Sequence, residues 1–284
     1  MTMGMEDYFV GYVTDPLKQL VYLNFDGGTT TQYSDYGNFT FDAFDTATLS
    51  DQLAGDANRT TLITGGGGVT GILANILTIF NTLPATLPGA PGGGLAQLVA
   101  QADFSDFTAA VSGLWFTTVN PSTQGLVQGS DYTTVYIGAP DQPLPGLLGL
   151  ASGIDVAGRN PANEAIVIAD NFAGIVPVTS TVQMLNSYSI AFANIIAHEL
   201  GHAIGLNHQP TTRLPLSWEL LADDPDNDTL TADDSNAGSV GLMAYQSNAL
   251  LISELSLLGT APLTSEEFAI GNVDTAQLLV WWFA

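Results

Sequence analysis

Residues 182–208 read VQMLNSYSIAFANIIAHELGHAIGLNH, which joins a long apolar segment to a histidine-rich end. From residue 182 to about 204 the apolar side chains recur at helical spacing on more than one side, which predicts a mostly buried helix. Residues 198–208 match the pattern H-E-x-x-H-x-x-G-x-x-H without a mismatch, and all 3 histidines of the chain lie at its histidine positions. Such a complete match is not expected by chance, so it indicates a dedicated site.

This pattern predicts a catalytic zinc site. His198 and His202 are four residues apart on the expected helix, so their imidazoles project from one face and can bind the same ion. Gly205 can take the left-handed conformation that ends a helix, which lets His208 approach from a third direction. Three neutral imidazoles leave one coordination position open, as catalytic zinc sites do. We therefore expect His198, His202 and His208 to bind zinc, with Glu199 as the general base.

The expected chemistry is hydrolysis of a peptide bond. A bound zinc ion lowers the pKa of its water to around 7 and polarises the scissile carbonyl. Glu199 would accept the proton of that water and pass it to the departing amine. A Ser-His or Cys-His mechanism is excluded, because every histidine belongs to the motif and the chain has no cysteine. The sequence thus predicts a zinc-dependent endopeptidase with a metal-activated water.

The motif resembles that of the metzincin metallopeptidases. The resemblance extends to residues 241–245, GLMAY, which look like the methionine turn of that family. It implies that Met243 packs beneath the zinc ligands. It also implies that Tyr245 contacts the metal or the transition state, as in the serralysin-like and astacin-like branches. Residues 265–283 are similar to the C-terminal helix of serralysin-like catalytic domains, so the strong resemblance covers about residues 182–284.

The resemblance also implies a fold. We expect an α+β, metzincin-like zincin catalytic domain, in which a twisted mixed sheet and the active-site helix lie over a smaller, mostly helical lower lobe. Residues 1–284 would form this single domain, with the upper lobe at about 18–208 and the lower lobe at about 209–284. Substrate would lie extended along an edge strand of the sheet, by β-addition. We assign that edge to residues 153–170.

The remaining elements follow from periodicity and turn residues. β-branched and aromatic runs bounded by turns predict four strands, and apolar spacing predicts a buried helix together with a shorter one. The predicted strands are 19–25, 114–119, 132–138 and 164–170, the buried helix is 70–83, and the short helix is 46–53.

The charge balance restricts the partners. The chain has 28 acidic residues against 4 Lys and Arg, for a net charge of -24. Such a surface repels phosphate, so nucleic acid and anionic membrane are poor partners, and we expect neither nucleic-acid binding nor membrane insertion. No apolar run approaches the roughly 20 residues that a membrane-spanning helix needs. Asp224, Asp226 and Asp228 alternate in DPDND, the spacing with which a tight loop presents carboxylates to calcium, although a solvent-exposed acidic loop is the alternative.

Cysteine content does not identify the cellular compartment, because a chain without cysteine forms no disulfides in any compartment. Inhibition of a zymogen by a cysteine is likewise impossible. The opening residues, MTMGMEDYF, contain no basic start followed by an apolar stretch, so no signal segment is visible. We expect a secreted, extracellular monomer that acts on protein or peptide substrates. Two alternatives remain. One is an inactive extracellular module that binds partners through calcium and zinc, and the other is a zinc hydrolase of non-peptide amides. Glu199 argues against the inactive module.

Overall fold

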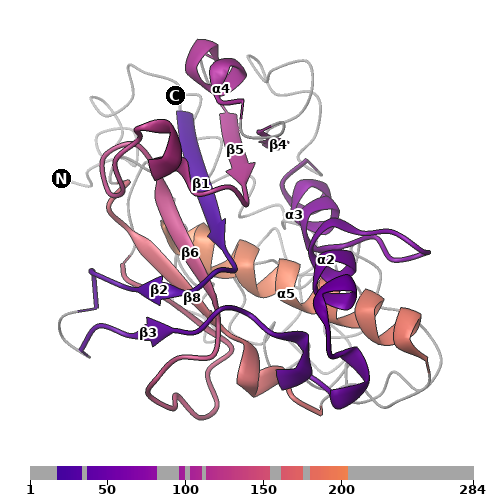
Figure 1. The fold of residues 1–284 in the computed structure, drawn as a ribbon. Coiled ribbons are helices and arrows are strands. Elements are labelled where there is room, and N and C mark those ends of the chain that lie inside the picture. The colour runs from indigo at the N-terminus through magenta and orange to yellow at the C-terminus, as the bar shows by residue number, and fades with distance from the viewer. Residues whose placement is uncertain are drawn as a thin grey trace, which may run out of the picture.

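The computed structural model describes residues 18–33, 37–81, 96–99, 103–110, 113–153, 161–174 and 180–203. These residues form an α+β arrangement around a mixed sheet (Figure 1). The sheet has six strands in the order β4-β5-β1-β6-β8-β7. In chain order the strands are β1 (Lys18–Asn24), β4 (Ala96–Leu98), β5 (Gly113–Thr117), β6 (Thr133–Gly138), β7 (Gly149–Ala151) and β8 (Glu164–Ile168).

The sheet is parallel except at one edge. Strands β4, β5, β1, β6 and β8 pair in parallel, and β7 pairs antiparallel with β8. The four strands predicted from the sequence correspond to β1, β5, β6 and β8, which are buried along nearly their whole length. Buried parallel strands read as continuous apolar and β-branched runs, which explains why these four were visible in the sequence.

Four α-helices and a small hairpin accompany the sheet in the described part of the chain. The helices are α2 (Asp56–Thr64), α3 (Ile72–Asn81), α4 (Ser105–Ala109) and α5 (Thr181–Ala203), and the hairpin pairs β2 (Gly28–Thr29) with β3 (Thr40–Phe41). Figure 1 shows α5 running across one side of the sheet toward α2 and α3. Helix α5 contacts β7, β8, α2 and α3. The predicted buried helices at 70–83 and from 182 are confirmed as α3 and α5.

The short helix expected at residues 46–53 is a pair of 3-10 turns instead. These are η1 (Thr46–Thr48) and η2 (Asp51–Leu53). The side chain of Asp45 accepts a hydrogen bond from Ala47 N, and Ser50 Oγ accepts one from Gln52 N, so each turn has its own N-cap. A second cap in the middle of the segment starts a new turn and ends the first, which prevents one continuous helix.

The edge strand also differs from the prediction. Residues 153–170 were expected at the edge, but their strand β8 lies between β6 and β7 and pairs with both. The edge strand beside β8 is β7, and β4 forms the opposite edge. Strand β7 has three residues and begins with Gly149, and a strand this short has too few positions to show an alternating pattern.

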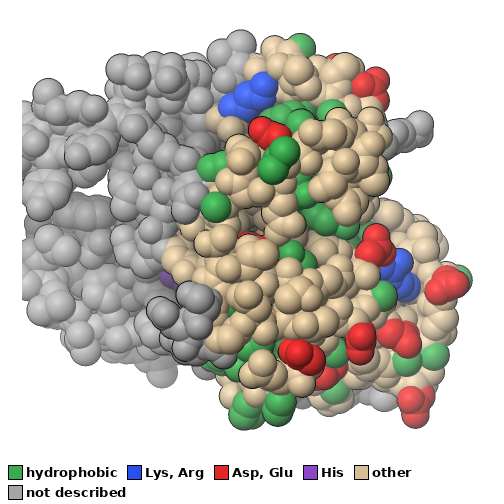
Figure 2. Space-filling model, turned by 60° about the vertical axis from the view of Figure 1, so that its left-hand side comes forward, with side chains coloured by type: hydrophobic (Ala, Val, Ile, Leu, Met, Phe, Trp, Pro, Cys, Tyr) green, Lys and Arg blue, Asp and Glu red, His purple; other side chains and the backbone are tan. Residues whose placement is uncertain are grey.

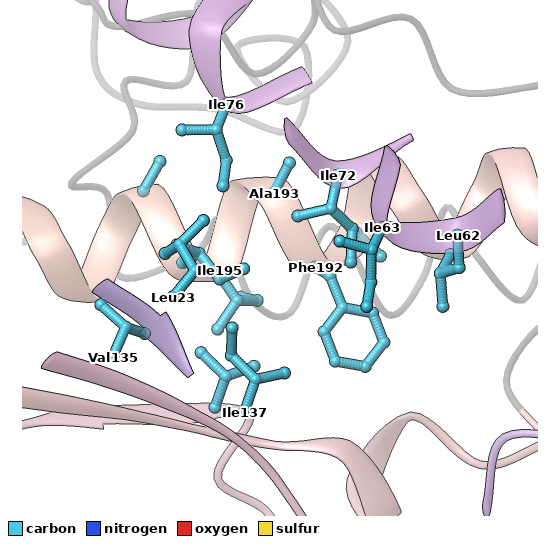
Figure 3. Packing of buried hydrophobic residues seen from close by; sticks show 14 of the residues in the cluster. Leu23, Leu62, Ile63, Ile72, Ile76, Val135, Ile137, Phe192, Ala193 and Ile195 are labelled. Atoms are coloured by element: carbon cyan, nitrogen blue, oxygen red, sulfur yellow. The ribbon is translucent and has the colours of Figure 1, made fainter. Parts of the chain in front are cut away.

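The main core lies between the sheet and the helices. Along β1 the side chains of Val21 and Leu23 enter this core, whereas those of Leu20 and Tyr22 belong to a cluster on the opposite face. This division follows from the alternation of side chains along a strand. Figure 3 shows Val135 and Ile137 of β6 on one side of α5 and Ile76 of α3 on the other. Residues of α2 belong to the same cluster. Helix α5 is therefore enclosed by apolar side chains over most of its length.

We predict that Phe192→Ala lowers the free energy of unfolding by about 3 kcal/mol. Phe192 is fully buried on α5, its ring stacks on Phe172 with centroids 4.5 Å apart, and it meets the Phe44 ring at 5.5 Å. Truncation leaves a cavity that rigid neighbours cannot fill. The control is Val182→Ala on the same helix, where the side chain is exposed. Urea unfolding of both variants measures the effect, and equal, small losses would contradict the prediction.

The described surface agrees with an acidic chain. Figure 2 shows Asp and Glu side chains spread over one face, with Lys and Arg in few places. In the described part, Arg59 forms an ion pair with Asp26 at 2.8 Å and also donates to the carbonyl oxygens of Phe25 and Phe44. One of the few bases thus ties helix α2 to the chain after β1. None of the helices in the described ranges has the length and apolar character that crossing a bilayer requires.

Candidate active site

The C-terminal end of α5 carries two of the three predicted zinc ligands. His198 and His202 are 3% and 7% exposed, and their ring centroids lie 5.1 Å apart with the rings nearly perpendicular. Ser180 caps the start of the helix, because its Oγ accepts a hydrogen bond from Gln183 N and donates one to Gln183 Oε1. A regular helix then sets the four-residue spacing, which brings both imidazoles to the same side.

The separation of these two imidazoles is compatible with a shared zinc ion. With nitrogen atoms about 2.0–2.1 Å from a tetrahedral zinc, two imidazole centroids lie roughly 5 Å apart. The observed separation of 5.1 Å agrees with that value. Within the described residues, no three His, Cys, Asp or Glu side chains are placed to hold a metal. The third predicted ligand, His208, lies outside those residues.

Glu199 lies between the two histidines in sequence and faces the edge strand. Its side chain is 5% exposed. A Cβ atom built on Gly149 of β7 would come within 2.6 Å of Glu199 Cγ and 2.7 Å of Glu199 Oε1, so the carboxyl group lies directly against β7. Burial raises the pKa of Glu199 to about 8, and a hydrogen bond from the backbone of Ala151 offsets part of that rise. The carboxyl group has left bulk water and is held by the edge strand.

The register of β7 determines which backbone groups reach the open edge. Ile168 N donates to Leu148 O at 2.9 Å, and Ser152 N donates to Glu164 O at 2.8 Å. Residues 148 and 152 therefore direct these groups toward β8. Because orientation alternates along an antiparallel strand, Gly149 and Ala151 direct their N–H and C=O groups away from β8. Among the described residues no strand pairs with this side of β7. There the backbone of Ala151 donates to Glu199, and the backbone groups of Gly149 lie beside it.

The hydroxyl group of Tyr33 contacts backbone carbonyl groups of both β7 and β8, where the two strands pair. Its hydroxyl lies 2.6 Å from Leu150 O and 3.2 Å from Glu164 O, and it can donate its hydrogen to one of them at a time. The ring is buried in a cluster with Phe39 and Ile166, against which Leu150 packs. Burial first, and then the charges of Glu199 and Glu164, raise the pKa of Tyr33 far above its usual value. The hydroxyl therefore stays protonated and able to donate.

A second buried carboxylate fixes the segment that carries Tyr33. Glu164, at the start of β8, is 1% exposed. It accepts hydrogen bonds from Thr31 N at 2.7 Å, Gln32 N at 3.0 Å and Gln128 Nε2 at 2.9 Å. Charge-assisted hydrogen bonds of this kind hold a loop firmly, since breaking them leaves a buried carboxylate unsatisfied. Glu164 thus has a structural role: it holds the segment that carries Tyr33, and Tyr33 in turn contacts β7.

The structure brings together only part of the predicted site. His198, Glu199 and His202 occupy one end of α5 as expected. The other predicted residues lie outside the described ranges, and their roles stay predictions: Gly205, His208, Asp224, Asp226, Asp228, Met243 and Tyr245. Sequence reasoning missed Gly149, Ala151, Tyr33 and Glu164, which approach the helix only through pairing between distant segments. A glycine inside an apolar run after a Pro-rich loop was the one local signal of close packing.

No family model, curated protein or solved structure matches this chain.

Proposed function

We propose that the chain is a zinc-dependent endopeptidase of the metzincin type. One observation carries the proposal: two buried imidazoles and one buried carboxyl group lie on a single helix, beside the edge strand β7 of the described sheet. Buried ionisable groups that gather at one place are typical of functional sites, because burial and neighbouring charges adjust their pKa values. The mixed sheet with α5 along it is compatible with the upper lobe expected for that family.

In this proposal His198, His202 and His208 hold the zinc ion, and Glu199 handles the proton. When bound, zinc makes a water molecule acidic and polarises the scissile carbonyl. A carboxylate oxygen of Glu199 takes the proton from the attacking water and gives it to the leaving amine. Burial raises the pKa of Glu199 to about 8 in the metal-free protein. A bound cation beside the carboxyl group would lower that pKa, which favours the carboxylate form that a general base needs.

The edge of the sheet favours an extended peptide as the substrate. Among the described residues no strand pairs with the outer side of β7, where Gly149 presents its N–H and C=O groups and Ala151 its C=O group. An extended peptide can pair with such an edge as an added strand. Main-chain pairing binds peptides of many sequences, whereas a small amide offers too few groups for it. The geometry thereby supports an endopeptidase over a hydrolase of small amides.

The test is metal analysis combined with hydrolysis of a quenched-fluorescence peptide library. We expect about one zinc per chain, loss of hydrolysis after dialysis against a chelator, and recovery when zinc is returned. Hydrolysis by metal-free protein would overturn the proposal. Zinc binding without peptide hydrolysis would favour the inactive binding module, and cleavage of small amides alone would favour the amide hydrolase.

A further inference from the structure

We propose that Gly149 is a positioning residue for Glu199: because it has no Cβ atom, the carboxyl group can pack against the edge strand. The catalytic consequence of this inference rests on the proposed function. The contact between Gly149 and Glu199 does not, since that contact follows from the packing of β7 on α5.

Gly149 is not required by the backbone. It is absent from the glycines with a positive φ, so its conformation is one that other residues adopt readily. Glycine inside a strand costs stability, because it loses more conformational freedom on folding and packs no side chain. A glycine at this position therefore needs another reason, and the space around its Cα provides one.

That space is taken by the candidate general base. A Cβ at position 149 would lie 2.6 Å from Glu199 Cγ, 2.7 Å from Glu199 Oε1 and 2.9 Å from Ile195 Cγ2. Real Cβ atoms essentially never approach other heavy atoms below 3.0 Å. Among the glycines whose surroundings are described, Gly149 alone would make such contacts with side chains; at Gly27, Gly65, Gly71 and Gly138 the atoms closer than 3.0 Å belong to the backbone.

The strand has little freedom to move away from an added methyl group. On one side β7 is paired with β8, and the Tyr33 hydroxyl is bonded to Leu150 O at 2.6 Å. The side chain of Glu199 is the more mobile partner, because a rotation about its χ angles clears the contact without moving the backbone. Alanine at position 149 should therefore displace the carboxyl group from β7, and leave His198 and His202 to bind metal.

The first experiment compares Gly149→Ala with Gly153→Ala. Gly153 lies two residues beyond β7, has no positive φ, and an added Cβ there meets nothing within 4 Å. We expect Gly149→Ala to keep one zinc per chain and to lower kcat by about 10- to 100-fold, since a displacement of about 1 Å at a reacting group can cost 10²-fold. The control should retain kcat within a factor of about two. Unchanged kcat in Gly149→Ala would overturn the positioning role.

The second experiment does not depend on activity. Melting temperatures of metal-free wild-type protein, Gly149→Ala, Glu199→Ala and the double variant form a double-mutant cycle. Gly149→Ala should lower the melting temperature when Glu199 is present. In the Glu199→Ala background that loss should shrink by at least half, because only the Ile195 contact remains.

The two experiments test the contact between Gly149 and Glu199 separately from the proposed enzymatic activity. Equal losses in both backgrounds would mean that the added methyl group does not meet Glu199, which overturns the inference. Coupling in the cycle together with no hydrolysis of any peptide would leave the contact established and reject the proposed enzyme. If Gly149→Ala alone is unfolded, recovery of folded protein in the double variant supports the contact, and failure to recover refutes it.

Discussion

Glu199→Gln should lower kcat by about 10²- to 10⁴-fold, while the zinc content stays the same. Glutamine has nearly the shape of glutamate, so it fills the same space against Gly149, but it cannot take a proton at neutral pH. None of the predicted zinc ligands is altered. If Glu199 is the general base, the loss should appear in kcat more than in KM, because the proton transfer takes place in the transition state.

Glu164→Gln provides the matched control. It makes the same chemical change in the other buried glutamate of the described residues, and Glu164 bonds to the chain around Thr31 instead of facing the helix end. We expect a lower melting temperature, because charge-assisted hydrogen bonds are weakened, with kcat of the folded fraction within several-fold of wild type. Equal kcat losses in both variants would show a general effect of disturbing the sheet, and would contradict a specific role for Glu199.

The helices and central strands were predictable because their signals are local. The apolar spacing of residues 182–204 and 70–83 appears in the structure as α5 and α3, and four apolar runs appear as buried strands. The motif placed His198, Glu199 and His202 on one helix for the same reason. Each of these inferences needs only residues that are close together in the sequence.

What the sequence did not predict depends on distant contacts. Strand β7 has three residues and exists because β8 pairs with it, so nothing local distinguishes it from a loop. Residues 153–170 were expected at the edge, since they combine a turn with a strand, but strand order is fixed by pairing across the sheet. Gly149 meets Glu199 across 50 residues, and Tyr33 meets Leu150 across 117. Such contacts become visible only when the fold is known.

The buried carboxyl group should also make the metal-free protein less stable as pH rises. Burial raises the pKa of Glu199 from 4.5 to about 8 in the folded state. Between these values the folded chain keeps a proton that the unfolded chain releases, so raising the pH favours unfolding. The stabilising contribution is complete below pH 4.5 and is lost as pH passes through about 8. At about 1.4 kcal/mol for each pH unit, the total is about 5 kcal/mol, of which about 4 kcal/mol falls between pH 5 and pH 9.

Glu199→Gln should abolish this dependence, because the amide does not titrate. His198 and His202 on the same helix, and Tyr33 beyond β7, are present in both proteins, so the difference between wild type and variant isolates Glu199. Urea unfolding with chelator at pH 5, 7 and 9 measures it. Between pH 5 and pH 9 the free energy of unfolding of the variant should rise relative to that of wild type by on the order of 4 kcal/mol. A constant difference would mean that the Glu199 carboxyl group ionises as readily in the folded chain as in water. In that case the edge strand would not desolvate it, and the close packing of Glu199 on Gly149 would be wrong.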